Sequence, residues 1–168
     1  MKFLKFTIVI SLLILSNVFG KNKLSVGFST GTSISNNIGL CSCIYTEYSL
    51  FSMMSIKLNL RHHLQKGFKR EISLLPTLSY NFSRILYSPY LEIGIGHSHY
   101  PESKGIYQKD GIDTIFYRGG GYGTCFIVGA GMKIPIRESL SITISSDIFH
   151  SSVSQEQINL SIGLQYIL

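Results

Sequence analysis

Three residues near the C-terminal end of the chain carry the groups that an activated nucleophile needs. His150 and Ser152 are separated by one residue, and Glu156 follows four residues after the serine. An imidazole can take the proton of a hydroxyl while a carboxylate orients the imidazole, which is the chemistry of hydrolases that form a covalent intermediate. The residues around them alternate with a period of two, and this parity predicts that all three lie on the same surface. The alternative is a chance pattern in a serine-rich segment.

A second set of ionisable residues falls at positions where the alternation points side chains to the opposite face. Ionised groups in a narrow protein interior need partners, because an unpaired buried charge is costly. Three of these residues are cationic and three are anionic, so they can neutralise one another as a charge network that fills the interior. A narrow polar channel is the alternative. The six residues are Lys57, Arg61, Glu71, Glu92, Lys133 and Asp147.

The cysteines and the remaining histidines do not indicate a metal site or a disulfide framework. Cys41 and Cys43 share one face of a predicted strand, with Cα atoms ~7 Å apart, which is near the upper limit for a disulfide. We therefore expect small interior side chains there, and no metal or cofactor. His62, His97 and His99 fall near strand ends on the opposite face, where lipid headgroups are the expected surroundings.

Eight segments of alternating apolar and small polar residues position these side chains. Alternation over such lengths places the two faces of a strand in different solvents. A soluble sandwich would bury the apolar face in protein, whereas a membrane barrel turns that face to lipid and the polar face to the lumen. Apolar residues on nearly every segment favour the barrel, and eight strands leave an interior that side chains fill. The segments are 24–31, 38–49, 54–61, 72–82, 90–96, 122–134, 139–150 and 158–168.

Two features interrupt the alternation. Pro76 stands inside the fourth segment and lacks a backbone donor, so we expect a bulge or weakened pairing there. Residues 101–121 hold a proline, several glycines and charged residues, and we expect the longest loop of the fold there. Aromatic residues near the segment ends are predicted to form girdles at the two membrane interfaces. They are Tyr48, Phe82, Tyr87, Tyr90, Tyr100, Tyr122 and Tyr166.

The first twenty residues have the composition of a secretory signal peptide. Lys2 and Lys5 precede an apolar stretch over 8–15, and cleavage is expected near Gly20. We therefore divide the chain into a signal peptide, 1–20, and a single domain, 21–168. The formal net charge of +6 is not concentrated in a basic cluster. Secretion and the absence of such a cluster argue against a nucleic-acid partner and favour contact with anionic lipopolysaccharide.

The order of the segments and the placement of their glycines resemble a known group. The stretches that carry the resemblance are K-L-S-V-G-F-S-T-G, S-P-Y-L-E-I-G-I-G, F-I-V-G-A-G-M-K-I-P-I and I-N-L-S-I-G-L-Q-Y-I-L. Together they resemble the small outer-membrane β-barrel domains of the OmpA/OmpX type over the whole of 21–168. The ending, with Tyr166 two places before Leu168, is similar to the closing strand of such barrels, although many relatives end in phenylalanine.

This resemblance implies an all-β, eight-stranded, antiparallel, up-and-down transmembrane barrel in a bacterial outer membrane, with both termini periplasmic. It implies a non-enzymatic, structural or surface-interaction role for a monomer without a cofactor. Outer-membrane lipid, including lipopolysaccharide, is the expected surrounding partner. The loop 101–121 is the expected site for an extracellular ligand.

A second resemblance concerns the His-x-Ser pattern. His150, Ser152 and Glu156 are similar to the catalytic residues of the outer-membrane lipid A 3-O-deacylases, which are eight-stranded barrels with a His-x-Ser at this strand end. This resemblance implies an esterase as the alternative function. Val153 stands where that family has an asparagine after the serine, and the segment leading to Glu156 is shorter than in that family.

Overall fold

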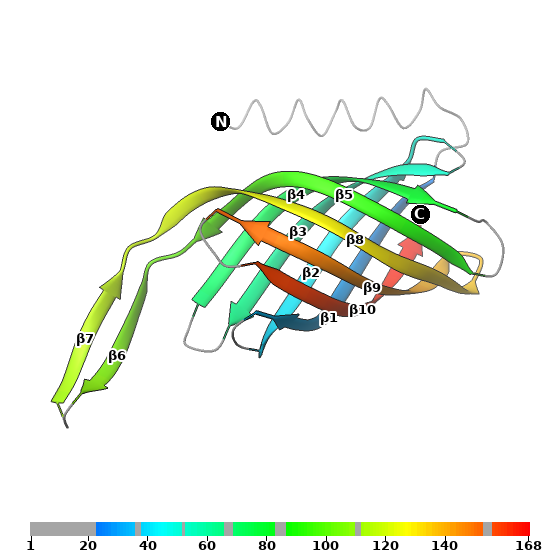
Figure 1. Cartoon of the computed structure of the whole chain (residues 1–168). Helices are drawn as coiled ribbons and strands as arrows, with labels where there is room; N and C mark the ends of the chain where they lie inside the picture. Colours follow the sequence, from blue (N-terminus) through cyan, green and yellow to red (C-terminus); the bar gives the residue numbers. More distant parts are fainter. Residues whose placement is uncertain are drawn as a thin grey trace.

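The computed structural model describes residues 23–35, 38–51, 53–65, 69–82, 87–109, 112–152 and 156–168, so the predicted signal peptide lies outside the described residues. Eight antiparallel strands close into a barrel in the ring order β1-β10-β9-β8-β5-β4-β3-β2 (Figure 1). The predicted all-β, eight-stranded antiparallel barrel is confirmed. Its strands are β1 (Leu24–Ile34), β2 (Ile38–Ser49), β3 (Met54–Gln65), β4 (Lys69–Asn81), β5 (Ser88–Tyr100), β8 (Gly121–Arg137), β9 (Leu140–Ser151) and β10 (Gln157–Ile167).

The first and last strands join directly and close the ring. Their pairing runs from Ser25 opposite Ile167 to Ile34 opposite Ile158. Beyond it, the N–H of Leu168 donates to the carbonyl oxygen of Leu24 at 2.9 Å. We call this end of the barrel the terminal end. Every strand of the barrel therefore has a neighbouring strand on both sides. Pairing between neighbours satisfies main-chain groups that would otherwise face hydrocarbon.

The two faces of each barrel strand differ in polarity in the opposite sense to a soluble protein. Outward apolar side chains are well exposed, with Ile44 at 60% and Ile95 at 68% of their full accessible surface. Inward polar side chains are buried, with Lys57 at 4% and Asp147 at 2%. The period-two pattern in the sequence thus corresponds to strands with one side on an apolar exterior and the other side on a polar lumen. No helix within the described ranges is long and apolar enough to cross a membrane.

The predicted loop 101–121 contains two further strands, which corrects that expectation. β6 (Ser103–Lys109) and β7 (Ile112–Arg118) pair antiparallel, with Ile106 opposite Ile115. They form a two-stranded ribbon that prolongs β5 and β8 beyond the barrel, at the lower left of Figure 1. We call it the ribbon, and the end of the barrel that carries it the ribbon end. Hydrophobic alternation did not reveal these strands, because a ribbon outside the barrel has no lipid-facing side to keep apolar.

Pro76 weakens pairing on one side of β4 only. It stays paired with Leu58 of β3. On the other side, the ladder with β5 includes Leu74 opposite His97 and then Thr77 opposite Gly94, and the two steps between them are missing. The register is the same on both sides of the gap, so the predicted weak pairing is confirmed without a bulge. A residue without an N–H cannot donate to the ladder, which accounts for the gap beside Pro76.

The aromatic residues near strand ends divide into two groups. Phe82, Tyr87, Tyr122 and Tyr166 are exposed, as residues of an interfacial girdle should be. Tyr90 and Tyr100 are buried, at 4% and 5% exposure, so their assignment to a girdle was wrong. Strand parity turns both of them into the lumen, where the large rings fill space between the strands.

Candidate functional site

The interior of the barrel holds a network of ion pairs. Arg61 on β3 reaches Asp147 on β9 with two parallel hydrogen bonds, each 2.9 Å. Asn159 on β10 donates to the same carboxylate at 2.8 Å. A bidentate guanidinium–carboxylate pair fixes both side chains in one geometry, so it ties opposite walls of the barrel together. The side chains of Arg61 and Asp147 are 9% and 1% exposed, so this pair is shielded from water.

Two lysine pairs continue the network toward the terminal end. Lys57 binds Glu92 at 2.8 Å, and its ammonium lies 4.1 Å from the centre of the Tyr90 ring. Lys133 pairs with Glu47, whose carboxylate also accepts hydrogen bonds from Ser55 and Gln165. The three cations thus each have an anion from another strand. Such contacts offset the cost of removing charges from water only when most of the hydrogen-bonding groups are satisfied, and here Arg61 Nε is the part of the guanidinium without a partner.

Five of the six predicted network residues meet in these pairs, and one does not. Glu71 is buried, but neither of its carboxylate oxygens has a hydrogen-bond partner. It lies opposite His63 in the pairing of β3 with β4. The third anion of the network is instead Glu47, which the prediction left out. Its parity with the inward residues Cys43 and Tyr45 was the sequence signal that could have identified it.

An apolar cluster fills the lumen on the ribbon side of Asp147. Phe149, Ile127, Leu75 and Cys125 pack together and are buried almost completely. The ring of His63 stacks on Phe149 with centroids 4.6 Å apart. Apolar side chains at this level argue against the alternative of a narrow polar channel. The sequence did not reveal the cluster because each member adjoins an outward apolar residue, so alternation alone left its face undecided.

The thiols and acidic groups do not form a redox or metal centre in the part of the chain that the structure describes. Cys41, Cys43 and Cys125 are buried free thiols. No group of three or more His, Cys, Asp or Glu residues in those ranges could hold a metal ion. The small side chains of the three cysteines leave room for the larger groups of the lumen.

The candidate nucleophile and its partners lie on the outer surface at the ribbon end, as parity predicts. His150, Ser152 and Glu156 are all exposed. The ring of His150 stacks on Phe126 of the neighbouring strand β8, with centroids 4.9 Å apart. The Ser152 hydroxyl accepts a hydrogen bond from the Thr124 N–H at 3.1 Å.

These three residues lie on the same surface but do not form a hydrogen-bonded catalytic triad. Among the described residues, no hydrogen bond joins His150 to Ser152 or to Glu156, so the serine has no base in position. Glu156 lies one residue before Gln157, which pairs with Phe149, and that register brings the carboxylate beside the strand position of His150. Catalysis would require the Ser152 side chain to leave Thr124 and turn to the imidazole.

Comparison with known proteins gives a clear result for structure and none for sequence. No protein-family model matches the chain, and no curated protein matches it. The crystal structure of Neisserial surface protein A aligns with a TM-score of 0.61 and 11% identity, over 86% of this chain and 96% of that one. The N-terminal β-barrel domain of Pseudomonas aeruginosa OprF aligns with a TM-score of 0.57 and 15% identity, over 88% and 100%. The outer-membrane enzyme PagL gives 0.54 and 12%, over 84% and 98%.

The fold is that of a transmembrane β-barrel. At these identities the likeness concerns the fold alone, because one barrel architecture supports unrelated activities. The similar barrels include a surface protein and an enzyme. A choice between a binding role and a catalytic role must therefore come from the side chains of this transmembrane β-barrel and from the ribbon.

Proposed function

We propose that this chain is an integral β-barrel protein of a bacterial outer membrane with a non-enzymatic, structural or surface-interaction role. The observation that carries the proposal is the apolar exterior of a closed barrel whose lumen is filled by paired charges and an apolar cluster. Such an interior suits a stable scaffold more than a pore. In this proposal the barrel is a monomer, both termini are periplasmic, lipopolysaccharide is among its lipid neighbours, and no cofactor is needed.

The ribbon is the element that we assign to surface contact. β6 and β7 pair with each other, and within the described ranges neither pairs with a third strand. Each therefore has one open edge of backbone donors and acceptors. An extended peptide can add to such an edge as a further strand, so a segment of an extracellular protein is the partner class that fits. A two-stranded ribbon alone is only marginally stable in water, and its continuity with β5 and β8 supports it.

Protease treatment of intact cells tests this arrangement. Trypsin should cut within the ribbon, at Lys104, Lys109 or Arg118, while the barrel stays protected. The protected barrel should also migrate differently on SDS gels before and after boiling, because nearly all of its backbone groups are paired between strands of a closed ring. A variant with 103–118 replaced by a short Gly-Ser linker should keep the heat-dependent shift and resist trypsin. Cleavage only after the outer membrane is permeabilised, or a soluble periplasmic protein, would contradict the proposal.

A lipid A 3-O-deacylase-like esterase is the second candidate function. The specific observation in its favour is that His150, Ser152 and Glu156 share the exposed outer surface at one barrel end. The hydrogen bond that holds the Ser152 hydroxyl at Thr124 counts against it. Val153 could contribute only a backbone N–H to an oxyanion site, which leaves the charge developing on the ester with few donors.

We expect the folded, purified protein to leave the acylation of lipid A unchanged in mass spectra. The physical reason is that the serine lacks a base within hydrogen-bond distance. Ser146, which is exposed on the same strand, provides a matched control. Deacylation that is lost in Ser152→Ala or His150→Ala, but retained in Ser146→Ala, would make the esterase the correct function.

A further inference from the structure

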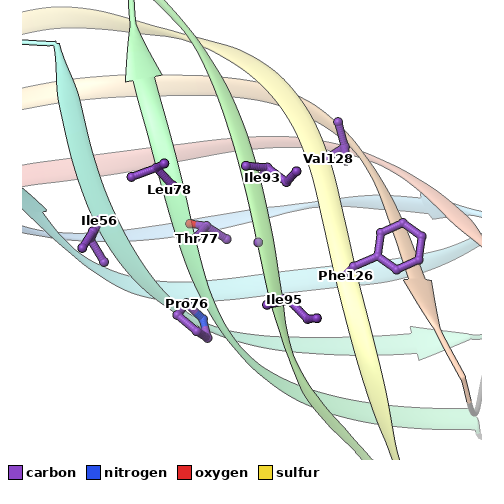
Figure 2. Close-up of a pocket in the computed structure, with 9 residues that line it drawn as sticks. Ile56, Pro76, Thr77, Leu78, Ile93, Ile95, Phe126 and Val128 are labelled. Atoms are coloured by element: carbon purple, nitrogen blue, oxygen red, sulfur yellow. The ribbon is translucent and has the colours of Figure 1, made fainter.

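The lipid-facing surface has an open apolar groove over the gap in the β4–β5 ladder. Its volume is 780 Å³, and Figure 2 shows Ile93 and Ile95 of β5 between residues of β4 and residues of β8. The groove coincides with Pro76, where two pairing steps between β4 and β5 are missing. The backbone itself therefore sets its position. The lining side chains include Ile56, Pro76, Leu78, Ile93, Phe126 and Val128.

Two imidazoles stand at the end of the groove that points to the ribbon. Ile95, Phe126 and His150 form one row across β5, β8 and β9, because Ile95 pairs with Phe126 and Phe126 pairs with His150. The stacking of His150 on Phe126 leans the imidazole toward the groove. His97 lies two residues beyond Ile95 on the same outward face and is exposed. The apolar lining of the groove thus ends beside two residues with ring N–H donors, His97 and His150.

The spacing of the two histidine positions on the sheet suits one small anion. Two strand spacings and one two-residue step separate the Cα atoms of His97 and His150 by ~12 Å, which two imidazole side chains and a phosphate can span. Thr124, which pairs with His97, is the strand position between them, and its N–H already donates to the Ser152 hydroxyl. The other charged or imidazole groups at this end include His62, His63, Arg70, Glu71, His99, Glu102 and Glu156, of which His63 and Glu71 face the lumen. The outward-facing groups beside the two histidines are thus mainly ring N–H and guanidinium donors, which suit an anion.

We propose that this groove and its two histidines bind one phosphate-bearing lipid, with an acyl chain along the groove and the headgroup phosphate between His97 and His150. The proposal rests on the outer-membrane location proposed above, because in a membrane this outward surface of the barrel contacts lipid. The apolar lining selects a chain and excludes a hydrated ion. Hydrogen bonds from the imidazoles then favour a phosphate monoester over the phosphate diester of a zwitterionic headgroup. The role is binding, and it does not require the serine to react.

Native mass spectrometry of the full chain, refolded in micelles at about pH 6, tests the site. The probes are phosphatidic acid, phosphatidylcholine with the same acyl chains, and inorganic phosphate. We expect phosphatidic acid to bind about tenfold more tightly than phosphatidylcholine, and inorganic phosphate not to be retained. The variant with His97→Gln and His150→Gln should reduce that preference to about twofold, whereas His62→Gln, on β3, should keep it.

A second variant tests the groove itself. Ile95→Trp fills the groove with a side chain that lipid tolerates, so both lipids should bind several-fold more weakly. Ile162→Trp, on the lipid-facing side of β10, is the matched control and should leave binding unchanged. An undiminished preference for phosphatidic acid in the double histidine variant, equal effects of the two tryptophans, or retention of inorganic phosphate alone would overturn the proposal.

The heat-dependent gel shift separates the two proposals. A protein that shows no shift would contradict the outer-membrane barrel and the lipid site together. A protein that shows the shift but has no preference for phosphatidic acid would overturn the lipid site alone. Each single histidine variant is compared in the same way, so that loss of folding in the double variant does not decide the result.

Discussion

Replacing Asp147 with leucine is expected to destabilise the folded barrel by about 3–5 kcal/mol. The change removes the bidentate partner of Arg61 and the acceptor of the Asn159 side chain. A guanidinium then remains in the lumen with only Glu92 nearby, at 3.9 Å. An unpaired buried charge costs more than the pair contributes, so the loss of one partner has a large effect.

The double variant Arg61→Met with Asp147→Leu distinguishes this cause from simple disruption of packing. Removing both charges leaves no unpaired ion, so its stability should lie within about 2 kcal/mol of the native protein. Glu138→Leu, in the exposed turn after β8, removes the same kind of charge from a solvated site and should change stability by less than about 0.5 kcal/mol. The chain has no tryptophan, so guanidinium unfolding in micelles is best followed by circular dichroism. Equal small effects of Asp147→Leu and Glu138→Leu would show that the network does not hold the barrel.

Sequence alone assigned an inward face to six ionisable residues, five of which take part in the lumen pairs. The reason is physical: lipid on one side and lumen on the other enforce a period of two, and a one-residue error would expose a charge to hydrocarbon. In the structure Lys133 and Asp147 pair with Glu47 and Arg61 across the lumen. Parity says nothing about height in the lumen, however. Which inward residues meet depends on the stagger of the strands, which alternation does not encode.

That limit explains the misplaced anion. Glu71 and Glu47 both have inward parity, and only the stagger brings Glu47 within reach of Lys133 across the lumen. The ribbon has a different explanation, because strands in water need no apolar face and leave no hydrophobic period. The groove beside Pro76 was foreseeable in part, since the missing N–H indicated weak pairing. The rest of its lining comes from side chains of β3, β5 and β8, which the sequence of β4 alone cannot show.

Replacing Gly31 with alanine is expected to prevent proper closure of the barrel. Gly31 lies opposite Ser161 in the β1–β10 pairing that closes the ring. A Cβ added there would overlap the carbonyl oxygen of Leu160 and lie 2.6 Å from the Ser161 Cα. Both obstacles are backbone atoms, so no rotamer change can relieve the overlap. Separating the two strands at this point costs about 3 kcal/mol or more. The separation would occur in the pairing of β1 with β10, which closes the barrel.

Gly163 gives an independent test of the same junction from the other strand. A Cβ on Gly163 would overlap the carbonyl oxygen of Phe28, so Gly163→Ala should have a similar effect. Gly119 is the matched control, because an added Cβ there meets no atom within 4 Å. The fraction of protein that shows the heat-dependent gel shift after refolding measures closure directly. If Gly31→Ala and Gly119→Ala refold to the same extent, the two strands are farther apart than this structure has them, and β1 and β10 do not form the tight junction described above.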